Sequence, residues 1–266
     1  MDTATKAFCA CTLLTLGFSF AFVGKGSLLS REKTLLPLQE AVSTKKITSN
    51  PVVVLELFTS QGCSSCPAAD ILLEAELKKQ NSNTIALAYH VDYWNYLGWE
   101  DPFSKPEFAE RQRAYASRFK SRRVYTPQLV VDGKSEFVGS DAAKFARAIE
   151  SARQGTSSQV AISFSDKAIE DGKLIISYEA VGLPKGAELH FALLRNRATT
   201  KIEAGENEGL NLANTNIVIH LQTRKEAIGK ETFLLPSNVL PSELSLVAFA
   251  QEPHLGPIVG GTILHL

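Results

Sequence analysis

Cysteine and methionine are scarce in this chain, and what it lacks excludes several classes of protein. The 266 residues include 4 cysteines, 1 methionine and 2 tryptophans, and 28 basic residues are balanced by 28 acidic ones. A formal net charge of zero without an arginine-rich run gives no indication of a nucleic-acid partner. Beyond the N-terminus, no stretch approaches the roughly 18 apolar residues of a membrane-spanning helix. A composition of 44% hydrophobic and 21% charged residues is typical of a folded protein.

The N-terminal segment has the pattern of an export signal. Lys6 precedes an apolar run over residues 7–23, and polar sequence resumes at Lys25. The cleavage pattern around Phe22-Val23-Gly24 is weak, so an uncleaved membrane tether through residues 7–23 stays open, as does a buried helix. We expect an exported protein, periplasmic or extracellular, in a compartment where disulfides persist.

Four parts are expected along the chain. These are a signal peptide or N-terminal membrane anchor over residues 1–26, a polar linker over 27–50, an α/β domain over 51–155 and a β-sandwich-like domain over 156–266. In the α/β part, strands are predicted over 52–58, 84–91, 128–131 and 136–138, and helices over 67–79, 107–120 and from about 141. The later part contains seven short apolar runs separated by turn residues, which is typical of a β-sandwich.

The two cysteines outside the N-terminal segment are Cys63 and Cys66, in a C-x-x-C spacing. They lie where the first predicted strand gives way to a helix starting near Pro67. Unpaired N–H groups and the helix dipole at such a turn stabilise a thiolate. We therefore predict that Cys63 attacks a disulfide and Cys66 resolves the product. The alternative is an inert structural disulfide between the same residues.

Other uses of a C-x-x-C pair are poorly supported. A zinc site or an iron–sulfur cluster ordinarily takes four ligands, and no second cysteine pair exists outside the N-terminal segment. Haem attachment needs a histidine directly after Cys66, where this chain has Pro67. No cofactor is predicted.

The order of predicted elements resembles the thioredoxin fold, and the chain is similar to DUF1223, a family of exported thioredoxin-like proteins without a settled activity. The matching motifs are Glu56-Leu57-Phe58-Thr59-Ser60-Gln61-Gly62-Cys63-Ser64-Ser65-Cys66-Pro67, His90-Val91-Asp92-Tyr93-Trp94, Leu97-Gly98-Trp99, Asp101-Pro102-Phe103, Arg111-Gln112, Tyr125-Thr126-Pro127-Gln128, Gly205-Glu206-Asn207 and Gly260-Gly261. The resemblance implies that Pro127 is a cis-proline and that Thr126 and Pro127 shape a substrate groove beside the cysteines. The expected fold is an α/β thioredoxin-like domain followed by an all-β sandwich-like C-terminal domain.

Three residues are candidates for acid/base chemistry. Thioredoxins often carry a buried acid six residues before the first cysteine, and Glu56 lies one place from that position; its alternative is a structural ion pair. His90 and Asp92 flank the end of a predicted strand, where catalytic groups often collect in α/β sheets. His90 could also be a hydrogen-bonded structural residue, or join Cys63 and Cys66 in a Cu(I) or zinc site.

Aromatic residues are concentrated between His90 and the Thr126–Pro127 pair. Trp94 and Trp99 form either a small satellite core or an apolar cover that grips a substrate near the cysteines. The leading hypothesis is an exported thiol–disulfide oxidoreductase acting on a protein or small-molecule thiol or disulfide. A Cu(I)-binding chaperone and a non-catalytic protein with a silent disulfide are the alternatives.

Overall fold

The computed structural model describes residues 52–79, 83–155 and 158–266. The predicted export segment and the linker lie outside the described residues. No helix in the described part of the chain is both long and apolar enough to cross a membrane. The elements, in chain order, are β1 (Val53–Thr59), α1 (Cys66–Leu77), β2 (Thr84–His90), a 3-10 turn η1 (Asn95–Leu97), α2 (Pro106–Arg118), β3 (Gln128–Val131), β4 (Ser135–Val138), α3 (Ala142–Gly155), β5 (Ala161–Glu170), β6 (Lys173–Val181), β7 (Glu188–Lys201), β8 (Asn211–Arg224), β9 (Ile228–Leu234), η2 (Pro241–Glu243), β10 (Leu244–Gln251) and β11 (Ile258–His265).

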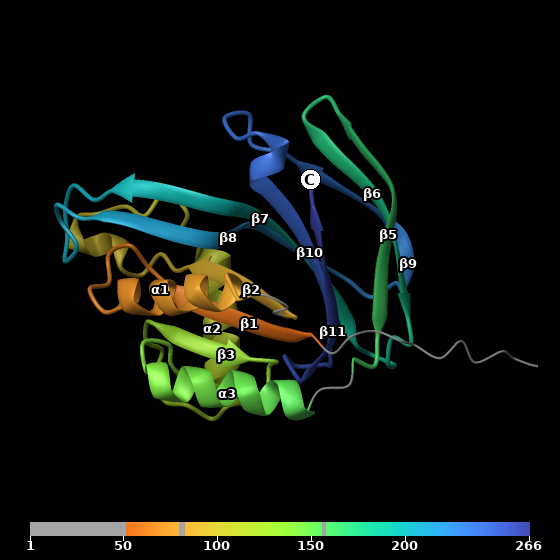
Figure 1. The fold of residues 1–266 in the computed structure, drawn as a ribbon, viewed down its shortest axis with the longest axis horizontal. Helices are drawn as coiled ribbons and strands as arrows, with labels where there is room; N and C mark the ends of the chain where they lie inside the picture. Colours follow the sequence, from red (N-terminus) through yellow and green to blue (C-terminus); the bar gives the residue numbers. More distant parts are fainter. Residues whose placement is uncertain (1–51, 80–82, 156–157) are drawn as a thin grey trace, which may run out of the picture. The chain divides into compact units, whose positions relative to one another are not determined.

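The described strands form two sheets (Figure 1). The larger has eight strands in the order β11-β10-β7-β8-β2-β1-β3-β4, and the smaller has three in the order β5-β6-β9. Within the larger sheet, β1 pairs parallel with β2 and antiparallel with β3. Within this larger sheet, the strands β1 to β4 join the strands β7, β8, β10 and β11 where β2 and β8 pair in parallel at Ala88 and Ile217. The Asn216 amide strengthens this junction by donating to the carbonyl of Ala86 (3.1 Å).

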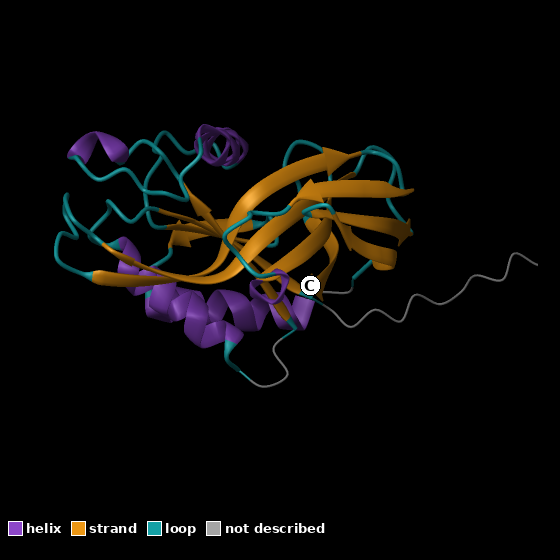
Figure 2. Cartoon of the chain, turned by 90° about the horizontal axis from the view of Figure 1, so that it is seen from above, coloured by secondary structure: helices purple, strands orange, loops and turns teal. Residues whose placement is uncertain are grey.

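Helices cover both faces of the β1–β4 part of the sheet (Figure 2). Leu55 and Leu57 of β1 pack with Leu73 of α1 and Phe145 of α3 on one face. Phe58, from the same strand, packs on the other face with aromatic residues of α2. Every residue of β1 is buried, because the strand has a helix on each side.

The predicted fold class, an α/β thioredoxin-like domain followed by an all-β sandwich-like domain, is wrong. Strands β7, β8, β10 and β11 come from the segment predicted as a sandwich, yet they extend the sheet that contains β1 to β4. The structure is mostly β, with one large mixed sheet and one small one. The seven strands predicted after residue 156 are all present, but four of them extend the large sheet instead of forming a separate β-sandwich.

The burial of β10 gives the physical reason for this difference. Leu246 and Ala248 pack toward the small sheet, whereas Val247 and Phe249 pack into the core that includes α2. All eight residues of β10 are buried. A strand of a simple two-sheet sandwich has one solvent face, whereas β10 is covered on both. The apolar run over residues 246–250 of this strand therefore indicates a central strand.

Candidate functional site

The cysteine pair lies in the turn that joins β1 to α1. The N–H of Cys63 donates to the carbonyl of Ser60 (3.2 Å), and the N–H of Cys66 donates to the carbonyl of Cys63 (3.2 Å). Helix α1 then begins at Cys66, with Pro67 in its first turn, where a missing N–H costs nothing. Both cysteines are free thiols at the N-terminal end of this helix.

The two thiols have opposite acidities. A hydrogen bond from the Cys66 thiol is the main reason that the pKa of Cys63 falls from 9.0 to about 6, against the effect of burial. The hydroxyls of Ser65, 3.3 Å from the Cys63 sulfur, and of Thr126 lower it further. Burial raises the pKa of Cys66 well above its ordinary value, and the charges of Cys63 and Asp70 add to this. This asymmetry favours ionisation of Cys63 over ionisation of Cys66.

Cys63 is much less accessible than its position in a turn suggested. Its side chain is 1% exposed and that of Cys66 is 0% exposed, whereas Ser64 and Ser65 between them are exposed. Tyr93 lies near the sulfurs. Its own burial raises the pKa of Tyr93, and negative charge on the cysteine sulfurs raises it further. A reagent can reach the Cys63 sulfur only when the surrounding segments move.

The turn between β7 and β8 holds the cysteine segment from outside. Asn207 is buried and its amide donates to the carbonyls of Gln61 (2.8 Å) and Cys63 (2.9 Å). The carboxylate of Glu206 accepts from the N–H of Ser64 (2.9 Å). Gly205 has φ +80°, and a Cβ there would lie 3.4 Å from the Cβ of Trp99. In the sequence, these residues belong to the Gly-Glu-Asn motif of the family resemblance, and no structural or functional role was predicted for them.

Gln61 connects the cysteine segment to three other parts of the chain. Its side-chain amide donates to Thr200 (3.1 Å) and Asn214 (3.0 Å), and its side-chain oxygen accepts from the indole N–H of Trp99 (3.2 Å). Its backbone N–H donates to Asp101 (2.8 Å). Gln61 could not be singled out from the sequence as a site residue, because an amide carries no charge and has no metal-ligand spacing.

His90 is fully buried and paired with Asp101, which the sequence had not singled out as its partner. Its Nδ1 lies 2.7 Å from the Oδ2 of Asp101, and both side chains are fully buried. Burial opposes a charge on His90, but Asp101 and Asp70 outweigh it and raise the His90 pKa above 6.5. The Nε2 atom is buried and has no hydrogen-bond partner in the described part of the chain. Asp92 contributes only its backbone carbonyl, which accepts from Asn95 (3.0 Å).

Asp70 is the residue that the sequence interpretation missed. It lies four residues after Cys66 in α1, so the two side chains share one face of the helix. Its Oδ2 accepts from the hydroxyl of Thr59 (3.2 Å), and its Oδ1 is buried without a hydrogen-bond partner among the described residues. Burial raises the pKa of Asp70 to about 6. The i, i+4 spacing from Cys66 was the available signal.

Asp70 also borders a path to solvent. A cleft of about 190 Å³ between α1 and the start of β8 is lined by Asp70 and Asn214, together with Pro67 and Glu74. A proton on Asp70 can therefore exchange with water without passing the cysteines.

Replacing Asp70 with asparagine is expected to stabilise the protein at neutral pH by about 2–3 kcal/mol, the cost of keeping a buried carboxylate whose pKa is raised from 3.8 to about 6. The folded state keeps a proton that the unfolded state has already released between these two values. Stability should therefore fall as pH rises through this window and then level off. Urea unfolding against pH checks this. Asp166→Asn, an exposed control, should leave the profile unchanged, and an unchanged profile for Asp70→Asn would contradict the assignment.

Glu56 does not lie at the cysteines. Its carboxylate accepts from the Nε of Arg111 (2.7 Å) and from the hydroxyl of Tyr115, all three residues being buried on the α2 side of the sheet. The side chains of neighbouring β1 residues alternate, so Leu57 and Glu56 face opposite sides. Glu56 therefore has the structural ion-pair role that was its alternative.

The other predicted residues surround the cysteine turn from the Trp94–Trp99 segment and the start of β3. A Cβ on Gly62 would lie 3.2 Å from the Cβ of Trp94, so this tryptophan packs directly on the cysteine turn. The Thr126–Pro127 peptide bond is cis. The Thr126 hydroxyl lowers the pKa of both thiols.

The alternative metal site is not assembled. Among the described residues, no group of three His, Cys, Asp or Glu side chains is placed to hold a metal ion. Cys63, Cys66 and His90 thus do not converge on one point.

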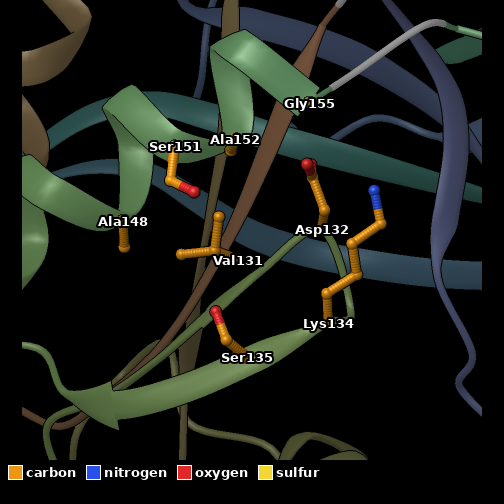
Figure 3. A pocket seen from close by; sticks show the side chains of 8 residues that line it. All are labelled: Val131, Asp132, Lys134, Ser135, Ala148, Ser151, Ala152 and Gly155. Atoms are coloured by element: carbon orange, nitrogen blue, oxygen red, sulfur yellow. The ribbon is translucent and has the colours of Figure 1, made fainter.

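A cavity of about 400 Å³ lies far from this chemistry, between α3 and the β3–β4 hairpin (Figure 3). Small side chains of α3, such as Ala148 and Ser151, form one wall, and Asp132 and Lys134 stand at the opposite side. Asp132 has a structural role, because its carboxylate accepts a hydrogen bond from the backbone N–H of Val54 in β1 (2.8 Å). None of the predicted site residues lines this cavity.

Fold and site together define a β-rich protein with a buried C-x-x-C thiol pair at a strand-to-helix turn of a mixed sheet. The model of the DUF1223 family, described as a protein of unknown function, matches residues 54–251. The chain belongs to this family. No curated protein matches it.

Solved structures extend the comparison. The crystal structure of a protein from Agrobacterium tumefaciens is 27% identical, with a TM-score of 0.61, over 81% of this chain and 95% of that one. A domain of the outer membrane lipoprotein Omp28 from Porphyromonas gingivalis is 12% identical, with a TM-score of 0.25, over 41% of this chain and 88% of that one. The second similarity is too low to support an argument.

Proposed function

We propose that the protein is a thiol–disulfide oxidoreductase that uses Cys63 and Cys66. The observation that carries this proposal is the asymmetry of the pair: the Cys66 thiol donates to Cys63, which lowers the Cys63 pKa to about 6, while the pKa of Cys66 is raised. A thiolate that forms near neutral pH is the attacking species in disulfide exchange. A purely structural pair has no need of such an asymmetry.

The exchange proceeds in two balanced steps. The Cys63 thiolate attacks one sulfur of a substrate disulfide, which forms a mixed disulfide and releases the other substrate sulfur as a thiolate. Cys66 then loses its proton and attacks the Cys63 sulfur, which closes the Cys63–Cys66 disulfide and releases the second substrate thiolate. The substrate gains two electrons and the protein loses two. The reverse sequence oxidises a dithiol.

Asp70 is the group best placed to take the proton from Cys66. It lies on the same face of α1, has a buried oxygen without a hydrogen-bond partner among the described residues, and has a pKa of about 6. A carboxylate with that acidity is ionised at neutral pH but holds a proton more strongly than an exposed aspartate. Loss of the proton to the cleft beside Asn214 would reset it.

Substrate entry requires a local opening, since Cys63 is 1% exposed. The exposed turn around Glu206 and the aromatic segment with Trp94 and Trp99 are the parts that would move. Thr126 and Pro127 would then contact the substrate beside the sulfur. The substrate is a protein or small-molecule disulfide. We place the reaction outside the cytoplasm, on the evidence of the apolar run at residues 7–23.

The experiment that tests the proposal is exchange with an aromatic model disulfide whose thiol product is coloured. In a variant whose other two cysteines are replaced (Cys9→Ser and Cys11→Ser), the reduced protein should release two product thiols for each chain and finish with Cys63 bonded to Cys66, as mapped by mass spectrometry. Release of a single thiol, or formation of a stable mixed disulfide on the unmodified protein, would contradict the resolving role of Cys66. No release would overturn the proposed function and favour a silent pair.

A further inference from the structure

A groove lined by Phe103, whose ring also contacts His90, has the composition of a ligand site. Its inner part, of about 400 Å³, is lined by polar groups of β7, namely Arg195, Thr199 and Thr200, and by the side chains of Phe103 and Ile219. This volume lies in the range of small-molecule sites.

The arginine in this groove has no anionic partner. Arg111, Arg153, Arg197 and Arg224 each pair with a glutamate, whereas none of the ion pairs found in the described residues includes Arg195. The Nε of Arg195 is buried and has no hydrogen-bond acceptor among the described residues. Its guanidinium lies 5.9 Å from the centre of the Phe103 ring. A planar guanidinium with free donors matches a carboxylate in shape and charge.

The groove continues into an apolar part. A second cavity, of about 360 Å³, shares Ile219 and Pro236 with the first and is lined further by Leu193 and Leu234. Leu234 is 75% exposed, an unusual setting for a large aliphatic side chain at the edge of a cavity. No acidic side chain lines either part in the described residues. The groove thus has one cationic, hydroxyl-rich end and one largely aliphatic end, which His220 also lines.

We propose that this groove binds an amphiphilic carboxylate of the fatty-acid class, with its carboxylate on Arg195 and its chain over Ile219 and Leu234. Charge complementarity selects an anion at the inner end, and the apolar extension selects an aliphatic chain. Thr199 and Thr200 supply hydroxyl donors beside the arginine. Thr200 also accepts from Gln61 (3.1 Å), so the ligand site adjoins the network around the cysteine segment.

The test compares decanoate with decanol, which has the same chain without the charge, by calorimetric titration of the full chain in the absence of any disulfide substrate. Decanoate should bind at least about tenfold more tightly than decanol, a difference of about 1.4 kcal/mol. Arg195→Gln should remove this difference. Arg197→Gln is the matched control on the same strand, because Arg197 already pairs with Glu74; it should leave both affinities within about twofold.

Leu234→Ser tests the apolar end without disturbing the core, since Leu234 is largely exposed. It should weaken both decanoate and decanol while preserving the preference for the acid. Equal binding of acid and alcohol by the unmodified protein, or equal losses in the two arginine variants, would overturn the proposal. Absence of any binding heat together with an unchanged melting temperature would overturn it as well. None of these outcomes depends on the cysteines.

Discussion

Replacement of Cys63 by serine, in the background without Cys9 and Cys11, is expected to reduce thiol–disulfide exchange to the rate without protein. A serine hydroxyl remains protonated at neutral pH and cannot form a disulfide, so neither step of the exchange can begin. Cys66 cannot substitute for it, because burial and the nearby charge of Asp70 raise its pKa. The measurement is the initial rate of thiol release from the model disulfide, with equal amounts of folded protein.

Replacement of Cys66 by serine should give a different result. The Cys63 thiolate still attacks, but no neighbouring thiol displaces the substrate, so a mixed disulfide accumulates and one thiol is released per chain. Ser64→Ala, an exposed change between the cysteines, is the control and should leave two thiols released. If Cys63→Ser exchanged as fast as the unmodified protein, the assignment of Cys63 as the nucleophile would be wrong.

The second large effect concerns stability. Arg111→Met is expected to destabilise the protein by about 3–5 kcal/mol, because it leaves the carboxylate of Glu56 buried without its counter-charge. Arg111 also donates to the side-chain oxygen of Gln251 (2.9 Å) and stacks near Tyr115 and Phe249, so its loss affects β1, α2 and β10 together. Urea unfolding followed by circular dichroism gives the free energy.

Two further variants separate lost charge pairing from lost packing. Arg113→Met, on the exposed side of the same helix, should change stability by no more than about 0.5 kcal/mol. Glu56→Gln combined with Arg111→Met should recover much of the loss, since a neutral amide can still accept from the Tyr115 hydroxyl. A double variant as unstable as Arg111→Met alone would show that the buried charge is not the cause.

Individual helices and strands were predictable from the sequence, because each is specified by residues that lie close together along the chain. The apolar run that forms β1, Pro67 in the first turn of α1 and Asp132-Gly133 before β4 each specify structure within a few residues. The partners of each strand are specified by long-range packing instead. Burial of β10 on both faces results from α2 and from the small sheet, which lie far from it in sequence.

The same distinction explains the candidate site. The positions of Cys63 and Cys66 follow from their spacing and from the strand-to-helix turn. The partner of His90 could not be predicted, since both Asp92 and Asp101 lie in an irregular segment, and only folding brings Asp101 to 2.7 Å from the ring. The Gln61 and Asn207 amides reach across more than a hundred residues. Asp70 was within reach of the helix spacing rule and was overlooked.

The most direct test of the account is the pH dependence of Cys63 alkylation in the reduced, unmodified protein. Iodoacetamide reacts with the thiolate, so the rate of modification at Cys63, followed by mass spectrometry, reports its ionisation. The account predicts that the rate rises with pH, reaches half of its plateau at about 6, and that Cys66 stays unmodified. A midpoint near the ordinary value of 9.0, or modification of Cys66 before Cys63, would contradict it.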